Sequence, residues 1–480
     1  MSIFNFEIPD NSEDILEKNI KLSNNIFKFI KEKKIEKEIK KISLLLNFPE
    51  GEMSFFFSKK IFLNFLNKST KTNFTKKIKF SWFSRYYLYF FIYPFFLMLF
   101  KKKNSKKKKI KYIIDSIGSD IELSLFKNFE KQEGTENILY LSEKKKLKGK
   151  NIIPYDFMNT GFRIVDVICY YKIFFYSLKL SLTTKINFVY LSLSFLKEYY
   201  YYKNFFLYNN AEFLLTHKHY DTSNVKCFFF KKFGGKIYAT IQKNISTTNS
   251  NSFFYYADYN FSFSENVKIP IKERFNYFKK NVPIGSFFME NLFLNHTKNI
   301  NFSPSKEDRF DVLCVAGNDI QPLGFYDSWE DHNKIYKLHL DWLKQASIEF
   351  PKLKFGFKHR QNNNNNFEEK VLEGSNVIIV NKRYNSYDIA QNSKLVLSFA
   401  STMIIELLTL GIKSFYLNPD FKNKQFLNDI KDYEKISIKN YLALKNCIIN
   451  LDSSEKINKY EYCENSEKVT EKIINHLKKL

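Results

Sequence analysis

Short apolar runs alternate with amphipathic segments along most of the chain beyond residue 110. Seven runs have the length and composition of buried strands: 213–216, 236–241, 311–315, 353–358, 376–380, 394–398 and 413–417. Four segments between them repeat apolar residues at helical spacing: 223–233, 331–349, 385–392 and 402–410. Strands that alternate with helices predict parallel sheets whose faces are covered by helices.

The alternation occurs in two regions, which a connector at 271–306 separates. A length of 480 residues also exceeds what a single hydrophobic core usually serves. We therefore predict an α/β fold with two doubly wound, Rossmann-like domains that face one cleft. The expected organisation is an extra helical region at 1–110, a first domain at 111–270, a second domain at 300–450, and a C-terminal helix within 451–480 that returns across the cleft.

The N-terminal region combines a predicted long amphipathic helix at 11–46 with an apolar stretch and a polybasic tract. Residues 86–100 are uncharged and mostly aromatic or aliphatic, and KKKNSKKKK follows at 101–109. The stretch contains Pro94 and is shorter than the roughly 20 residues that a spanning helix needs. We interpret it as a membrane-surface patch whose lysines contact anionic lipid. A buried helix with an exposed lysine loop and a single-pass anchor are the alternatives.

The formal charge of +26 rests on 76 basic residues, of which only six are Arg. Proteins that recognise nucleic acid favour Arg, whose guanidinium group can form two hydrogen bonds at once. The lysine excess is instead typical of an AT-rich coding sequence, with the lysines distributed over solvated faces. We therefore expect no nucleic-acid partner. Five scattered cysteines form no C-x-x-C pair, so neither a metal site nor a disulfide framework is predicted. The acidic N-terminus does not resemble a signal peptide, which predicts a cytoplasmic protein, peripheral at the inner face of the membrane.

In doubly wound sheets, ligands bind beyond the carboxyl ends of the strands. The segment SFAST stands between a predicted strand and a helix start, where free backbone N–H groups favour anions. Its hydroxyl residues Ser398, Ser401 and Thr402 predict a phosphate cradle, and ordinary N-capping is the alternative. Glu406 lies one helical turn further on and is a candidate to accept hydrogen bonds from a ribose, unless it only interacts with the helix dipole.

Two other strand ends of the second region carry further candidates for nucleotide binding. Gly317 and Asn318 follow the first strand of this region, and Lys358, His359 and Arg360 end the second. The two cations suit phosphate charge, and the imidazole of His359 can donate to a phosphoryl oxygen of a leaving group. A solvated strand end with the same residues is the alternative.

A resemblance to a known enzyme family rests on three motifs: KFGFKHR, YNSYDIAQNSKLVLSFASTMIIELLTLGIKSFYLN and YDTSNVKCFFFKKFGGKIYATIQ. They resemble bacterial surface-carbohydrate glycosyltransferases of the GT-B architecture, the capsule and lipopolysaccharide transferases with Kdo-transferase-like, polysialyltransferase-like and glycerophosphotransferase-like members. The resemblance implies that His359 and the Ser401–Thr402 turn surround the phosphates of a nucleotide-sugar donor. The sequence departs from the family in Arg360, where relatives often have Pro, and at 242–244, where QKN replaces Gln-His-Gly.

The first domain resembles the acceptor domain of this architecture, so a catalytic base is expected there. Asp115 and Asp120 flank the first strand-to-helix turn, and Asp221 follows the strand 213–216. A carboxylate in such a place can accept a proton from an acceptor hydroxyl. We favour Asp120, and a turn or capping role is the alternative for each of the three.

The predicted function is transfer of a sugar from a nucleotide-sugar donor to a cell-surface glycan or its lipid-linked precursor. Neither a cofactor, apart from the donor as substrate, nor a metal is expected. One alternative is a nucleotide-sugar epimerase of the same fold, which needs no second substrate. The other is a membrane-associated scaffold that binds glycan or partner proteins without turnover of a donor.

Overall fold

The computed structural model describes residues 15–66, 85–99, 108–143, 147, 149, 151–155, 162–164, 166–245, 253–296, 309–316, 329–359, 366–380, 385–399, 401–419, 427, 429–453 and 459–480. The chain divides into two compact units. The first consists of Met1–Ile241, Ser250–Asn260 and Pro270–Lys280, and the second consists of Gln242–Asn249, Phe261–Ile269 and Asn281–Leu480.

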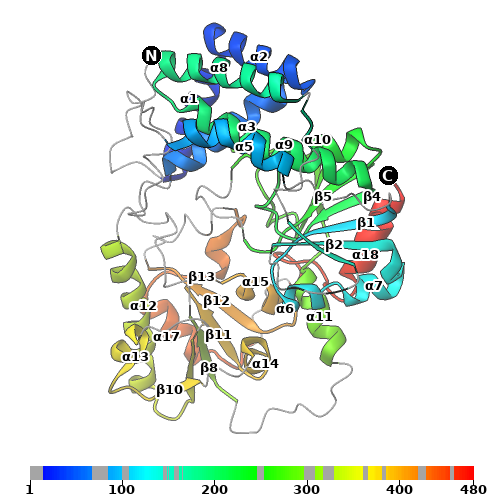
Figure 1. The fold of residues 1–480 in the computed structure, drawn as a ribbon. Helices are drawn as coiled ribbons and strands as arrows, with labels where there is room; N and C mark the ends of the chain where they lie inside the picture. The colour runs from blue at the N-terminus through cyan, green and yellow to red at the C-terminus, as the bar shows by residue number, and fades with distance from the viewer. Residues whose placement is uncertain are drawn as a thin grey trace. The chain divides into compact units, whose positions relative to one another are not determined.

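The first sheet has the strand order β3-β2-β1-β4-β5-β6-β7 (Figure 1). Its strands are β1 (Lys108–Ile117), β2 (Ile138–Ser142), β3 (Ile152–Pro154), β4 (Asn209–Thr216), β5 (Ile237–Ile241), β6 (Tyr259–Ser262) and β7 (Lys280–Pro283). β1 pairs in parallel with β2 on one side and with β4 on the other. The strand order therefore changes direction between β1 and β4, where a ligand crevice is expected at the carboxyl ends.

Helices of the first unit fall into two groups. The short helices α6 (Asp120–Ser124) and α7 (Lys127–Glu133), with the 3-10 turn η3 (Thr135–Asn137), connect β1 to β2, and α10 (Asn224–Lys232) connects β4 to β5. The others gather into one helical cluster (Figure 1): α1 (Ile15–Ile30), α2 (Lys33–Leu46), α3 (Glu50–Leu66), α5 (Arg85–Leu99), α8 (Asp166–Thr184) and α9 (Phe188–Tyr208). Aromatic rings fill this cluster, as where Phe195 meets Phe48 and Phe56 edge to face.

The single long helix predicted at 11–46 is wrong, because the described part of this range forms the two helices α1 and α2. Glu32 has extended backbone between them, with ψ of 131°. The reason is packing: α1 lies mainly against α3, whereas the apolar side chains of α2 contact both α8 and α3, so the second helix needs a different direction from the first. The chain also breaks between α8 and α9, where Lys185 has a φ of 61° and Asn187 caps α9.

The second sheet has the order β10-β9-β8-β11-β12-β13 and is parallel at every pairing between its described strands. Its strands are β8 (Val312–Val315), β9 (Phe355–Lys358), β10 (Val377–Val380), β11 (Leu395–Ser398), β12 (Lys413–Leu417) and β13 (Ser437–Ile438). The direction of the strand order changes between β8 and β11, so this sheet has its own expected ligand crevice.

Alternate residues of the second sheet supply two hydrophobic cores. Leu313 on β8 packs toward α14 (Ser386–Ala390) and α15 (Met403–Leu408), whereas Val312 and Cys314 pack toward α12 (Trp329–Glu349) and α17 (Tyr441–Ile449). The remaining helices of this unit are α11 (Phe287–His296), α13 (Phe367–Leu372), the 3-10 turn η7 (Tyr433–Ile436) and α18 (Val469–Lys478), which packs against α11.

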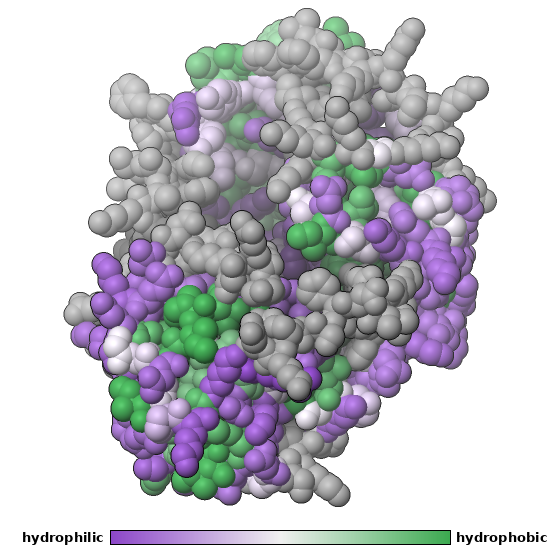
Figure 2. Space-filling model, turned by 90° about the horizontal axis from the view of Figure 1, so that it is seen from below, coloured by the Kyte–Doolittle hydropathy of each residue, from purple (hydrophilic) through white to green (hydrophobic). Residues whose placement is uncertain are grey.

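The predicted α/β class with two doubly wound parallel sheets is confirmed. β12 has the predicted limits 413–417, and the other six predicted strands lie on β4, β5, β8, β9, β10 and β11. Hydrophilic residues are spread over much of the face visible in Figure 2, as expected of a lysine excess on solvated surfaces. Within the described ranges, no helix has both the length and the hydropathy needed to cross a bilayer.

Candidate active site

The carboxyl ends of four neighbouring strands of the first sheet line a cavity of about 430 Å³. Ser116 lies near the end of β1, Glu143 follows β2, Tyr155 follows β3, and Asp221 lies in the loop after β4. The volume falls in the range of small-molecule sites. The cavity therefore occupies the crevice that the change of strand order between β1 and β4 predicts.

Helices complete the wall of this cavity. The additional lining residues come from α3, α9, α10 and the loop between β4 and α10: Phe56, Lys59, Lys60, Glu198, Tyr202, Tyr220, Thr222, Ser223, Asn224 and Lys226. Charged, hydroxyl and aromatic side chains thus meet in one place. Such a lining suits a polar ligand that is held by hydrogen bonds and by contact with rings.

Asp115 is fully buried at the end of β1 and is not among the residues that line the cavity. Its Oδ1 accepts hydrogen bonds from the Tyr155 hydroxyl and from the Ser116 N–H at 2.7 Å. Its Oδ2 accepts from Lys226 Nζ and from Thr216 Oγ1 at 3.4 Å. Burial alone lowers the pKa of Lys226, but the adjacent Asp115 carboxylate raises it well above its usual value. Asp115 therefore orients the cavity residues Lys226 and Tyr155.

Ser116 has the left-handed backbone conformation, with a φ of 66°. The pairing of β1 with β2 shifts in register between Ile114 and Ile117, so Ser116 lies in a bulge. A non-glycine residue with positive φ is uncommon and costs conformational energy, which proteins retain mostly at functional sites. The bulge places Ser116 on the cavity wall while the preceding carboxylate remains beneath it.

Asp221 is the member of the three candidate aspartates that lines the cavity. Burial raises its pKa to about 6, and the negative charge of Glu143 adds to this effect, whereas Lys226 and Lys218 oppose it. A carboxyl group with a pKa this close to neutrality can take up and release a proton during a reaction. Its position and its pKa therefore both suit a general base.

Asp120, the base favoured from the sequence, is exposed at the first residue of α6 and does not line the cavity. The preceding residue, Ser119, caps this helix, because its Oγ accepts a hydrogen bond from the Glu122 N–H at 3.2 Å. A carboxylate in the first turn also interacts favourably with the helix dipole. The structure thus gives Asp120 the position of a helix-start residue and brings Asp115 and Asp221 to the cavity region instead.

The carboxyl edge of the second sheet brings Lys358 and Ser398 into one row. Val315 at the end of β8 pairs with Lys358 on one side and with Ser398 on the other. Ser398 Oγ donates to the Val315 carbonyl at 3.0 Å, and both Ser398 and Lys358 are fully buried. Three further nucleotide-binding candidates lie outside the described residues: Gly317, Asn318 and Arg360.

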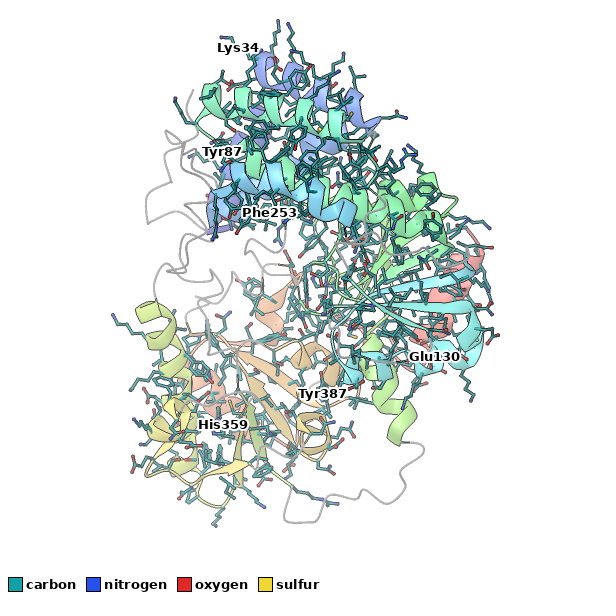
Figure 3. All side chains as sticks on the ribbon, in the orientation of Figure 1. Lys34, Tyr87, Glu130, Phe253, His359 and Tyr387 are labelled. Carbon is teal, nitrogen blue, oxygen red and sulfur yellow. The ribbon has the colours of Figure 1, made fainter. Side chains whose placement is uncertain are left out.

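His359 is buried directly after β9, in the second unit (Figure 3). Its Nε2 lies 3.2 Å from Glu369 Oε1, and its Nδ1 lies 3.8 Å from Glu368 Oε2. Both carboxylates belong to α13. His359 therefore contacts acidic side chains of its own unit, and its predicted contact with a donor phosphate stays a prediction.

The hydroxyl groups of the SFAST turn have distinct partners. Ser401 Oγ accepts a hydrogen bond from the Met403 N–H at 3.3 Å, as in helix capping. Thr402 makes no cap bond, and its Oγ1 accepts from the Ile245 N–H at 3.2 Å. Ser401 thus binds the first residue of α15, whereas Thr402 holds the N-cap position without a cap bond and its hydroxyl binds the segment after β5. The phosphate cradle stays a prediction.

Glu406 is only 2% exposed, and its two carboxylate oxygens accept hydrogen bonds from the hydroxyls of Ser286 and Tyr387. Burial raises the pKa of Glu406, and the two hydrogen bonds oppose that rise. The carboxylate therefore joins the segment before α11 to α14 inside the second unit. A ribose contact by Glu406 stays a prediction.

Asp221 is the one lining residue that the sequence-based prediction named, and the residues it missed include Lys59, Tyr155 and Lys226. Lys226 lies 111 positions from its partner Asp115, so no local pattern connects the two. A lysine between apolar residues in the predicted helix 223–233 was the available signal for a buried cation. Lys59 belongs to α3, a helix for which no prediction was made, because its apolar residues lie on all sides and leave little periodicity.

No known protein family and no curated protein matches the sequence. Solved structures of similar fold include the MnaA–UDP complex of Staphylococcus aureus, at 11% identity and a TM-score of 0.49, with 77% of this chain and 96% of that chain covered. MurG of Acinetobacter baumannii has 11% identity and a TM-score of 0.39 over 77% of this chain and 100% of its own. The wall teichoic acid polymerase TagF has 12% identity and a TM-score of 0.44 over 82% and 95%. Identities this low do not transfer an activity.

Proposed function

We propose that the chain is a glycosyltransferase that moves a sugar from a nucleotide-sugar donor to a hydroxyl of a cell-surface glycan or its lipid-linked precursor. The observation that carries this proposal is Asp221 on the wall of the cavity in the first sheet, with a pKa raised to about 6. An acceptor hydroxyl needs a base of this kind, because it becomes a good nucleophile only as its proton leaves.

In the proposed reaction, the acceptor oxygen forms a bond to the anomeric carbon of the donor sugar. The bond between that carbon and the phosphate oxygen breaks, and its electron pair leaves with the nucleotide. The acceptor proton moves to an Oδ atom of Asp221, while Asp115 keeps Lys226 charged and in place beside the cavity. Charge develops on the leaving phosphate. Phosphate binding by the hydroxyl and N–H groups of the SFAST turn, in the second unit, is a separate proposal.

The place of the reaction is proposed to be a membrane surface, because the helical cluster has an exposed apolar face. We define this two-helix apolar face by side chains that are 42 to 76% exposed: Leu88, Phe91 and Phe95 on α5, and Ile164, Ile168 and Phe175 before and on α8. The two helices meet where Tyr171 stacks on Phe91 with centroids 5.7 Å apart. An apolar face next to the polybasic segment 101–109 in the sequence suits an anionic membrane surface.

The test is turnover of UDP-, CMP-, CDP- and GDP-sugars by the full chain with and without a membrane extract as acceptor source. We expect one donor class to be consumed only when acceptor is present, with sugar transferred to the extract. Sugar inversion without a second substrate would establish the epimerase instead. Binding of a donor without any turnover, under conditions where the wild-type chain is folded, would support the scaffold.

A further inference from the structure

The cavity of the first unit holds three lysines, and two of them have a carboxylate partner. Lys60 Nζ lies 3.0 Å from Glu198 Oε1, and Lys226 Nζ binds Asp115. For Lys59, in contrast, no carboxylate lies within ion-pair distance among the residues that the structure describes. As far as the described residues go, the charge of Lys59 is therefore not neutralised by a direct carboxylate partner.

Within the described part of the chain, Lys59 makes one hydrogen bond at the cavity, in which its Nζ donates to the Thr222 carbonyl at 2.8 Å. An ammonium group has three donors, so two of them remain available to a ligand. Burial lowers the pKa of Lys59 to about 8, and the positive charge of Lys60 adds to this effect, whereas Glu198 and Asp221 oppose it. Lys59 is thus mostly charged at neutral pH, although its surroundings disfavour the charge.

We infer that Lys59 binds an anionic group, a phosphate or a carboxylate, that the acceptor substrate carries near its reactive hydroxyl. An anion at Lys59 adds a counter-charge in direct contact, beyond the more distant Glu198 and Asp221, and accepts hydrogen bonds from the remaining donors of the ammonium group. Ser116 lines the same cavity and offers a hydroxyl as a second donor. Asp221, on the same wall, is left to receive the proton of the hydroxyl. The identification of the anion as part of an acceptor rests on the proposed function, whereas the anion site itself does not.

Inorganic phosphate and acetate are the probes, and they separate the two sources of charge, a phosphorylated acceptor and an acidic sugar. Calorimetry of the full chain at pH 7, without donor, measures the affinity for each. We expect one of the two to bind, and Lys59→Gln to weaken that binding by at least about tenfold, the loss of one charge-assisted hydrogen bond. Lys59→Arg keeps the charge and should restore most of the affinity.

Lys236→Gln is the matched control, because Lys236 is an exposed lysine of the same unit that pairs with Glu212 at 3.1 Å and lies outside the cavity. It should bind the probe like the wild type, and the melting temperature of each variant reports folding. Equal affinity of wild type and Lys59→Gln, or no binding of either probe to wild type, would overturn the inference. Displacement of the bound probe by the donor nucleotide alone would also overturn it, since the cavity would then hold the donor.

The outcome for the site is distinguishable from the outcome for the proposed function. If the chain binds phosphate through Lys59 but consumes no nucleotide-sugar with any acceptor source, the anion site is supported and the proposed transferase activity is refuted. In an active chain, Lys59→Gln should raise the acceptor KM about tenfold with kcat within about twofold, because the anion contributes binding in the ground state and transition state alike.

Discussion

Asp221→Asn removes the proposed base and keeps its shape, so it separates catalysis from folding. Loss of a positioned general base costs about 10²- to 10⁴-fold in kcat. In the wild type, the rate should rise about tenfold per pH unit up to a pH of about 6 and then level off, since the carboxylate is the active form. The residual rate of the variant should lack this limb. The assay is initial rate against pH with saturating donor and acceptor.

The same variant has a calculable effect on stability. The pKa of Asp221 rises from its usual value of 3.8 to about 6 in the folded chain, so folding favours the protonated form. This stabilising contribution is complete below pH 3.8 and is lost as the pH rises through 6. The shift of about two units corresponds to about 3 kcal/mol at 1.36 kcal/mol per unit, which solvent contact reduces to about 1–2 kcal/mol. Asn mimics the protonated acid, so the variant should be more stable than wild type by that amount at pH 7.5 and equally stable at about pH 3, below the unfolded-state pKa.

Urea unfolding at the two pH values measures this difference. Asp120→Asn is the control, since Asp120 is exposed at the start of α6 and should affect the rate less than about twofold. A large loss of rate in Asp120→Asn with little loss in Asp221→Asn would refute the assignment of the base. Equal stability of wild type and Asp221→Asn at both pH values would refute the electrostatic reasoning.

Three further outcomes are expected. Lys226→Met leaves Asp115 charged and buried without its partner, so the free energy of unfolding should fall by about 3–5 kcal/mol in urea titration; an unchanged midpoint would contradict the ion pair. Replacing the lysines of 101–109 by Gln, or Phe95 with Ile168 by Ser, should weaken flotation with anionic vesicles, and flotation equal to wild type would dismiss the membrane surface. The double variant Ser401→Ala/Thr402→Ala should fold with a loss of at most about 0.5–2 kcal/mol per residue, while donor affinity in calorimetry falls by roughly 1.5–3 kcal/mol per lost bond; unchanged affinity with a lowered Tm would make the turn purely structural.

The regular elements of both sheets were predictable, because their pattern is local. β12 and α10 follow directly from a short apolar run and from helical spacing that ends at Gly234 and Gly235. The breaks after α1 and after α8 were not predictable, since the apolar stripe continues through both and the turn depends on which helix each segment packs against. Periodicity therefore identifies the elements but not the points at which packing redirects them.

The sequence indicated that a site would lie at the carboxyl ends of the strands, but it did not indicate which residues would line it. The rule that ligands bind at carboxyl ends of strands directed attention to Asp115, Asp120 and Asp221 alike. The three aspartates differ in burial and in partners. Asp115 pairs with a lysine 111 positions away, Asp120 is the first residue of a helix, and Asp221 lines the cavity. The residues next to each aspartate in the sequence do not indicate any of these contacts.

Part of the cavity wall belongs to α3, which contributes Phe56, Lys59 and Lys60 although it is not part of the sheet. α3 packs against the helices α1, α2, α9 and α10 and is not a strand of the sheet, so it can separate in a local unfolding event that leaves the strands intact. Each such event would dismantle the binding site without denaturing the unit. Ligand binding and the closed position of α3 are therefore thermodynamically coupled, and a bound ligand should slow hydrogen exchange of the amides of 50–66 more than that of the sheet.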